Sequence, residues 1–204
     1  MNESKCKICR REGTKLFLKG ARCMTAKCSF SKRMYPPGLR SFRRKKQSEY
    51  ARQIREKQKV KRFYGVNEQQ FRRYFKMAEA FRGNTGERLL NLLERRLDNV
   101  VCRLGYAHSR SEARQIIRHG HIQLNGRKSD IPSIIVEPKD VIDVKGKDKS
   151  RKLVNSRIEV NKDNDIPQWL SKEEGTKAIV AAMPSREDVS VETEEQLIVE
   201  ICSR

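Results

Sequence analysis

The first 45 residues constrain the fold most, because they hold too few large apolar side chains to build a core. They are rich in Lys, Arg, Gly and Ser, contain the turn sequence Pro36-Pro37-Gly38, and end in a run of basic residues. A segment of this kind stays irregular unless another component orders it. We therefore expect residues 1–45 to need a bound metal ion or a nucleic acid.

Positive charge is concentrated in the same region. Residues 1–60 hold 19 basic and four acidic side chains, so +15 of the net charge of +20 lies there. Binding a polyanion relieves the repulsion within such a segment. The alternative is a basic surface that faces only solvent. A small excess of lysine would be consistent with that alternative, but an excess of this size favours a polyanionic partner. Residues 145–204 hold 11 basic and 12 acidic side chains, which favours folding or protein contacts there.

The sequence also bounds the compartment. No apolar run approaches the roughly 20 residues that a membrane span requires. The first residues, MNESKCKICRREG, lack the apolar stretch of a secretory signal. We therefore expect a cytoplasmic protein in a reducing environment, where disulfides are rare. The six cysteines then need another explanation.

Four of the cysteines have the spacing C-x2-C-x13-C-x4-C: Cys6, Cys9, Cys23 and Cys28. Two close thiolate pairs separated by a loop suit one tetrahedral zinc ion, and the neighbouring Lys and Arg side chains favour thiolates. Four thiolates leave no position for water, so the expected zinc is structural. Free thiols and an iron–sulfur cluster stay open as alternatives. Cys102 and Cys202 are expected to be small buried apolar side chains.

Helical periodicity, and then alternation, organise the rest of the chain. We expect helices over residues 48–63, 68–81, 84–104 and 109–120. The turn sequence Asn125-Gly126 predicts a hairpin. Strands are expected at residues 122–124, 141–144, 177–183 and 197–202. Residues 145–152 are expected to form a charged loop.

Polar and basic residues cluster around the short helix that begins near Ser109. A helix–turn–helix–hairpin surface of this kind suits recognition of RNA shape and backbone, and the helix start adds a phosphate site. The candidates there are Arg96, Arg103, Ser109, Arg110, Arg114, Gln115, Arg118, His119 and His121. Further RNA-binding candidates are Arg55, Lys57, Lys59, Lys61, Arg62, Arg72, Arg73, Arg95 and Asn125. Alternatively, Arg96 or Arg114 forms an ordinary salt bridge with Asp98 or Glu112.

The stretch from Arg95 to Val144 resembles the small RNA-binding module named after the fourth protein of the bacterial small ribosomal subunit. That module also occurs in RNA-modifying enzymes, so the flanks matter. Phe63-Tyr64-Gly65-Val66, Gly83-Asn84-Thr85-Gly86 and Ile166-Pro167-Gln168-Trp169-Leu170 resemble the ribosomal family itself, and the four cysteines resemble its zinc-bearing branch. One departure is Ile201-Cys202, which replaces an aromatic pair expected before the C-terminus.

This resemblance implies an α+β fold in three parts. Residues 1–45 would form a zinc knuckle and basic extension. Residues 46–94 would form a helical rRNA-binding domain, on which the C-terminal residues are candidates to pack. Residues 95–204 would form the RNA-binding module, with its core at 95–144, continuing into a small antiparallel sheet with a C-terminal β extension.

The resemblance further implies a non-enzymatic constituent of the small ribosomal subunit. Such a protein binds small-subunit rRNA early, at a junction in the 5′ domain, and nucleates assembly. It contacts neighbouring ribosomal proteins, especially the fifth, and contributes to decoding accuracy. Its basic extension faces the channel through which mRNA enters, and the matching residues here are Arg40, Arg43, Arg44 and Lys46.

Two other classes of protein carry the same module. A pseudouridine synthase or tRNA-handling enzyme needs a second domain with a catalytic group, and neither flank shows a Gly-rich phosphate loop, paired carboxylates or a nucleophile beside a base. A non-ribosomal RNA chaperone explains the module but leaves the cysteines and the first helices unexplained. Stoichiometric presence in salt-washed small subunits distinguishes the ribosomal role from both.

Overall fold

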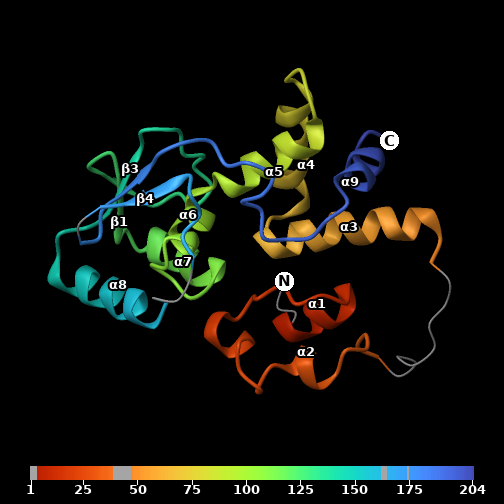
Figure 1. Cartoon of the computed structure of the whole chain (residues 1–204), viewed down its shortest axis with the longest axis horizontal. Coiled ribbons are helices and arrows are strands. Elements are labelled where there is room, and N and C mark those ends of the chain that lie inside the picture. Colours follow the sequence, from red (N-terminus) through yellow and green to blue (C-terminus); the bar gives the residue numbers. More distant parts are fainter. Residues whose placement is uncertain (1–3, 39–46, 162–164, 174) are drawn as a thin grey trace. The chain divides into compact units, whose positions relative to one another are not determined.

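The computed structural model describes residues 4–38, 47–161, 165–173 and 175–204. The chain forms two compact units, shown in sequence colours in Figure 1. The first comprises Met1–Gly86 together with Val191–Arg204, and the second comprises Glu87–Ser190. The units therefore divide within helix α5 (Thr85–Glu94), whereas the sequence led us to expect a boundary after residue 94. None of the described helices is long and apolar enough to cross a membrane.

The N-terminal part of the first unit is more regular than expected. It contains the helix α1 (Lys5–Glu12), the short 3-10 helix η1 (Gly20–Cys23) and the single-turn helix α2 (Ser29–Lys32). The Arg10 guanidinium lies 5.0 Å from the centroid of the Tyr35 ring, and its Nε donates to the Tyr35 carbonyl at 2.9 Å. Arg10 of α1 thus holds the segment at Tyr35, which the sequence predicted to be irregular. Leu16, between α1 and η1, is buried.

Two longer helices follow, and their caps explain their ends. The Ser48 hydroxyl accepts a hydrogen bond from the Ala51 amide and starts α3 (Glu49–Tyr64). Gly65, at φ 62°, ends it in the left-handed conformation that glycine tolerates best. The Asn67 side chain caps α4 (Glu68–Glu79) in the same way. The buried apolar side chains of α3 and α4 are Val60, Phe63, Tyr64, Phe71, Tyr74, Phe75 and Ala78.

The C-terminal residues form a helix, α9 (Glu195–Cys202), and the strand predicted at 197–202 is wrong. Leu197 and Ile198 are consecutive and both buried, whereas a half-buried strand would alternate. Figure 1 shows α9 beside α3. Gln53 Nε2 of α3 donates to Glu200 of α9 at 2.6 Å. A run of apolar residues without alternation does not distinguish a short helix from a strand.

The second unit begins with two helices where one was predicted. After α5, residues 95 and 96 leave the helix, and α6 (Leu97–Arg103) starts anew. Arg96 has extended backbone angles and bridges Ile135, while the Leu97 amide donates to the Ile134 carbonyl at 2.8 Å. Backbone hydrogen bonds to a distant loop therefore replace the helical bonds that would have joined α5 to α6.

A five-stranded antiparallel sheet carries the rest of this unit, in the order β2-β1-β3-β5-β4. Its strands are β1 (Ile122–Leu124), β2 (Arg127–Ser129), β3 (Val141–Val144), β4 (Leu170–Lys172) and β5 (Ala178–Val180). The strands predicted around 122–124, 141–144 and 177–183 are confirmed, with the last confined to its middle. The small antiparallel sheet and the α+β class are thus present.

Helices α6, α7 (Arg110–Arg118) and α8 (Asp148–Val160) share a core with this sheet. That core includes Val101, Ile117, Ile142, Val154 and Trp169. The charged loop predicted at 145–152 is wrong from residue 148 onward, because α8 starts there. Val154 lies in the core, and Leu153 and Ile158 pack against it, so apolar contacts stabilise a helix whose first turn is highly charged.

Candidate RNA-binding surface

The short helix α7 begins as the capping pattern predicts. The Ser109 hydroxyl accepts a hydrogen bond from the Glu112 amide at 3.3 Å. Glu112 Oε2 reaches back to the His108 amide at 2.9 Å, one residue before the expected cap, and its Oε1 accepts from Arg157 of α8 at 2.8 Å. A carboxylate of the chain itself therefore lies at the helix start where we expected a phosphate site.

Asp98 organises two of the predicted RNA-binding arginines. Only 1% of its side chain is exposed, and it accepts hydrogen bonds from Arg96 Nε at 3.0 Å and from the Arg96 terminal nitrogen at 2.7 Å. Arg114 Nε of α7 donates to the same carboxylate at 2.6 Å. Arg96 is 3% exposed, so the salt-bridge alternative describes it and it offers almost no surface to RNA. Arg114 keeps 28% of its side chain exposed.

A second buried carboxylate, Glu94, holds two further candidates. Arg103 Nη2 lies 3.0 Å from Glu94 Oε1, and the Asn99 amide donates to Glu94 Oε2 at 2.6 Å. Arg110 Nε in turn donates to Asn99 Oδ1 at 2.7 Å. This network joins the end of α5 to α6 and α7. It fixes the positions of Arg103 and Arg110 along one side of α6.

The exposed predicted residues lie at the other end of α7. Gln115, Arg118 and His119 are solvent-exposed, and no ion pair to Arg118 forms within the described ranges. The rings of His119 and His121 lie 6.1 Å apart. His121 Nδ1 lies 2.9 Å from the Ser150 hydroxyl of α8. Burial, together with the nearby His119 and Lys145, lowers the pKa of His121.

Two exposed basic residues on β2, Arg127 and Lys128, were not among the candidates. A Cβ added to Gly120, at φ +72°, would collide with Cε of Lys128, so the lysine stem lies against the end of α7. The signal was present in the sequence, because both residues directly follow the turn Asn125-Gly126 and a hairpin returns them toward the preceding helix. Together with Arg118 at the end of α7 they form a positive edge of this unit.

Asn125 shapes the hairpin. Its φ of 51° is left-handed, as the predicted turn requires. Its side chain donates to Asp140 at 2.8 Å and accepts from the Val141 amide at 2.8 Å. The structure therefore gives Asn125 a role in the turn, and its RNA contact stays a prediction.

Arg95 is similarly occupied within its unit. It is 9% exposed, and its Nε donates to the Val136 carbonyl at 2.7 Å. Burial lowers the pKa of the Arg95 guanidinium. Glu137, 3.9 Å away, raises this pKa but offsets only part of the effect of burial. Arg95 stabilises the loop before β3, next to the backbone bridge at residue 96.

In the first unit, most of the predicted basic residues on α3 and α4 are paired with carboxylates. Glu68 lies 2.5 Å from Lys57, 3.0 Å from Lys61 and 3.1 Å from Arg72. Burial raises the pKa of Glu68, but these hydrogen bonds outweigh that effect and bring it to about 2. The other pairs are Arg55 and Arg62 with Glu12, and Lys59 with Glu56. Arg73 is exposed and forms no ion pair with the residues that the structure describes.

Arg40, Arg43, Arg44 and Lys46 all lie outside the described residues.

The four N-terminal cysteines are all described. Cys6 and Cys9 lie on one face of α1, Cys23 ends η1, and Cys28 precedes α2. Burial raises the pKa of the Cys9 thiol, and proximity to the other three thiols raises it further. Backbone hydrogen bonds at Ser31 and Phe30 lower the pKa of Cys28. Within the described ranges, no group of three or more Cys, His, Asp or Glu side chains is arranged to hold a metal ion.

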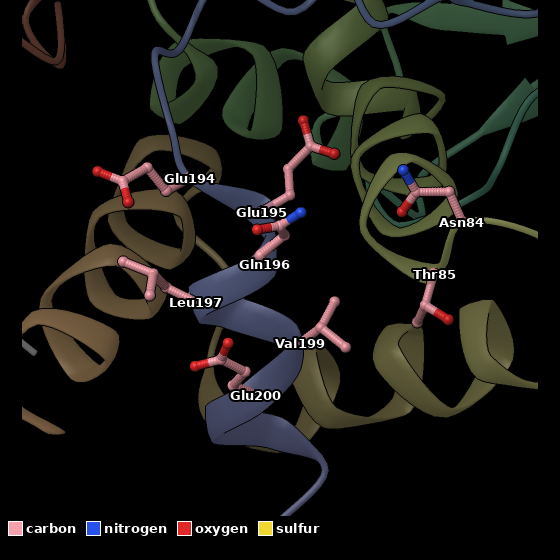
Figure 2. A pocket seen from close by; sticks show the side chains of 8 residues that line it. All are labelled: Asn84, Thr85, Glu194, Glu195, Gln196, Leu197, Val199 and Glu200. Carbon is pink, nitrogen blue, oxygen red and sulfur yellow. The ribbon is translucent and has the colours of Figure 1, made fainter. Parts of the chain in front are cut away.

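A pocket of about 600 Å³ in the first unit has the opposite charge (Figure 2). The carboxylates of Glu194, Glu195 and Glu200 line it with Asn84 and Thr85. The side chain of Glu195 packs against Gly86, where an added Cβ would lie 2.8 Å from its Cβ. Arg52 lies 3.2 Å from the Glu194 carboxylate and neutralises part of this charge, but the remaining carboxylates make the pocket unfavourable for phosphate.

Two family models together match residues 1–142. The description "Ribosomal protein S4/S9 N-terminal domain" matches residues 1–94, and "S4 domain" matches residues 95–142. The chain belongs to the ribosomal protein S4 family. The matched S4 domain thus contains α6, α7, the β1–β2 hairpin and the start of β3. It includes Asp98 and the arginines that Asp98 positions. Glu94 is the last residue of the preceding match.

Similar relatives extend the match over nearly the whole chain. The protein named "Small ribosomal subunit protein uS4" from Halothermothrix orenii is 56% identical over 98% of this chain and 96% of its own. Proteins of the same name from Caldicellulosiruptor saccharolyticus and Geotalea uraniireducens are 55% and 52% identical over the same shares. The S4-family chain therefore also shares with them the parts that follow residue 142, including α8 and α9.

Proposed function

We propose that this S4-family chain is a structural constituent of the small ribosomal subunit, in the cytoplasm, where it binds small-subunit rRNA and catalyses no reaction. The observation that carries the proposal is the identity of 50–56% over 98% or more of the chain to proteins named as small-subunit components. The net charge of +20 supports a polyanionic partner.

The second unit suggests how RNA is bound. Asp98 and Glu94 are buried and hold the side chains of the arginines that pair with them. Arg103 and Arg114 are partly exposed, so these side chains lose little conformational entropy when they bind RNA. The exposed cations at the end of α7 and on β2 are then available for phosphates. Contacts to phosphate position a protein on RNA without reading its sequence.

The place and timing of binding are part of the proposal. We expect the chain to dock early at a junction of the rRNA 5′ domain, to nucleate assembly there, and to contact the neighbouring fifth protein. Through that neighbour it would affect decoding accuracy. Arg40, Arg43, Arg44 and Lys46 would face the channel where mRNA enters and grip a single strand through its backbone.

A structural zinc ion is proposed at the N-terminus. The spacing and residue type of Cys6, Cys9, Cys23 and Cys28 suit tetrahedral zinc, and three of these thiols are buried, although the described side chains are not arranged around a metal position. Zinc would join α1, η1 and α2 and contribute folding energy to a segment with little core of its own. Membership of the zinc-bearing branch of the family rests on the same four residues.

The decisive experiment for the ribosomal role is binding of the full chain to a transcript of the 5′ domain of small-subunit rRNA, measured against salt. Each neutralised phosphate contributes about 0.7–0.9 to the slope of log K against log salt. We expect a slope of several units and incorporation into subunits at one copy each. A binding constant that does not change with salt, or absence from salt-washed subunits, would contradict the proposal.

A further inference from the structure

Helix α8 carries an uneven distribution of charge. Its buried side faces the core through Ser150 and Val154. Its exposed N-terminal part, with the residue before it, carries one carboxylate, Asp148, and four cations: Lys147, Lys149, Arg151 and Lys152. The exposed C-terminal part carries neutral residues and Glu159. The basic residues therefore form one patch at the start of the helix, which we call the α8 ridge.

The cations of the α8 ridge have no internal role that accounts for them. Within the described ranges none of the four forms an ion pair, whereas Arg157 on the same helix pairs with Glu112. Most cations on α3 are likewise neutralised, for example Lys57 and Lys61 by Glu68. Positive side chains also oppose the positive end of a helix dipole. Asp148 in the first turn offsets part of this repulsion, and the remaining excess of cations is the pattern expected when an external anion compensates them.

The α8 ridge adjoins the positive edge of the S4 domain. The Lys145 amide donates to the His121 carbonyl at 2.8 Å, and the Ser150 hydroxyl lies 2.9 Å from His121 Nδ1. His121 follows Gly120, against which the stem of Lys128 lies. These contacts connect the end of α7, strand β2 and the start of α8 within one unit.

We propose that the α8 ridge is a second RNA-binding surface of this chain, which holds the phosphates of the same rRNA that the α7 and β2 cations contact. Charge complementarity selects RNA as the occupant, since the ridge combines one carboxylate, Asp148, with four cations that form no ion pair among the described residues. The surface lies beyond residue 142, outside the matched S4 domain. The inference rests on the proposed rRNA binding and adds a specific set of contacts to it.

The test compares two full-length triple variants with the unmodified chain. Lys149→Gln, Arg151→Gln and Lys152→Gln removes three charges of the α8 ridge. The matched control, Lys139→Gln, Lys172→Gln and Lys177→Gln, removes three exposed charges elsewhere in the same unit. Lysine, arginine and glutamine have similar helix propensities, so α8 should persist, which circular dichroism checks. Binding to the 5′-domain transcript is then measured over a range of salt concentrations.

We expect the slope of log K against log salt to fall by about 2 in the α8 ridge variant and to stay unchanged in the control. An unchanged slope in a folded α8 ridge variant would overturn the inference while leaving rRNA binding by the unmodified chain intact. Equal losses in both variants would overturn it too, because the effect would then be one of net charge. Normal rRNA binding with poor incorporation beside other ribosomal proteins would assign the surface to an acidic protein partner instead. Failure of the unmodified chain to bind would refute the proposed function itself.

Discussion

Arg114 Nε donates to Asp98 at 2.6 Å, and Asp98 has only 1% of its side chain exposed. The same carboxylate pairs with Arg96, so one buried anion holds an internal cation and a partly exposed one. This arrangement assigns the two arginines different roles. Arg96 completes the interior of the S4 domain, and Arg114 is positioned at its surface.

The first prediction concerns Asp98. Replacing it with asparagine leaves Arg96 buried without its counterion, which typically costs about 3–5 kcal/mol of folding free energy. Urea unfolding of the full chain should show a lower midpoint. Glu137→Gln is the control, because Glu137 is 76% exposed and lies 3.9 Å from Arg95, so a change of less than about 1 kcal/mol is expected. Equal effects of the two substitutions would show that Asp98 has no special role.

The second prediction separates stability from RNA binding. Arg118 is exposed without an ion pair to any described residue, so Arg118→Gln should leave the unfolding midpoint unchanged. It should lower the salt slope of rRNA binding by about 0.7–0.9, the share of one phosphate. Arg96→Gln should instead lower the unfolding midpoint and reduce binding only through loss of folded protein. If Arg118→Gln leaves the salt slope intact, the positive edge at the end of α7 is not an RNA contact.

Glu68 provides a prediction about pH. Its pKa is lowered from 4.5 to about 2, so its pairing stabilises the folded chain fully above the unfolded value and is lost as pH falls toward 2. Because 38% of the side chain is exposed, screening reduces the contribution to about 1 kcal/mol. The stability of the unmodified chain should therefore decline more steeply than that of Glu68→Gln between pH 4.5 and 2. Parallel declines would mean that Lys57, Lys61 and Arg72 contribute nothing through this carboxylate.

The zinc proposal predicts one metal ion per chain. Cys9→Ser with Cys28→Ser should abolish zinc in freshly purified protein, as elemental analysis would show, and should expose residues 4–38 to proteolysis. Cys102→Ala with Cys202→Ala is the matched control and should retain the metal. Zinc at full content in the first double variant would rule out this ligand set, and iron with sulfide in the unmodified chain would favour a cluster instead.

The basic extension predicts a division of labour. Neutralising Arg43, Arg44 and Lys46 should leave subunit assembly close to normal and slow translation of messages with stable structure near the place where mRNA enters. Neutralising Arg96 and Arg114 should impair assembly first. Because both arginines pair with Asp98, we expect the defect to come from reduced folding of the chain. Accumulation of the same immature particles by both variants would show that the extension packs on rRNA instead.

Sequence patterns predicted the local elements that depend on caps and turns. Ser48, Ser109 and Asn125 each make the hydrogen bonds that their residue types favour. The patterns failed where tertiary contacts decide. Residues 95 and 96 leave the helix to bond with a distant loop, and α8 forms because Val154 meets the core. α9 is a helix where apolar residues without alternation suggested a strand.

The candidate site shows the same limit. Residue type identified the basic cluster around Ser109. It did not show which of these cations pair with carboxylates or carbonyls of the chain itself. Arg96 pairs with Asp98, an alternative that the sequence left open, whereas the Arg95 bond to the Val136 carbonyl joins distant residues that only the fold brings together. Lys128 was missed although the predicted hairpin at Asn125-Gly126 already returned it toward Gly120.

Crosslinking in purified small subunits tests the central claim most directly. The chain should be present at one copy per salt-washed subunit, and crosslinks from α7 and β2, near Arg118 and Lys128, should map to the 5′ domain of the rRNA. Its absence from such subunits, or crosslinks confined to other RNAs, would contradict the account.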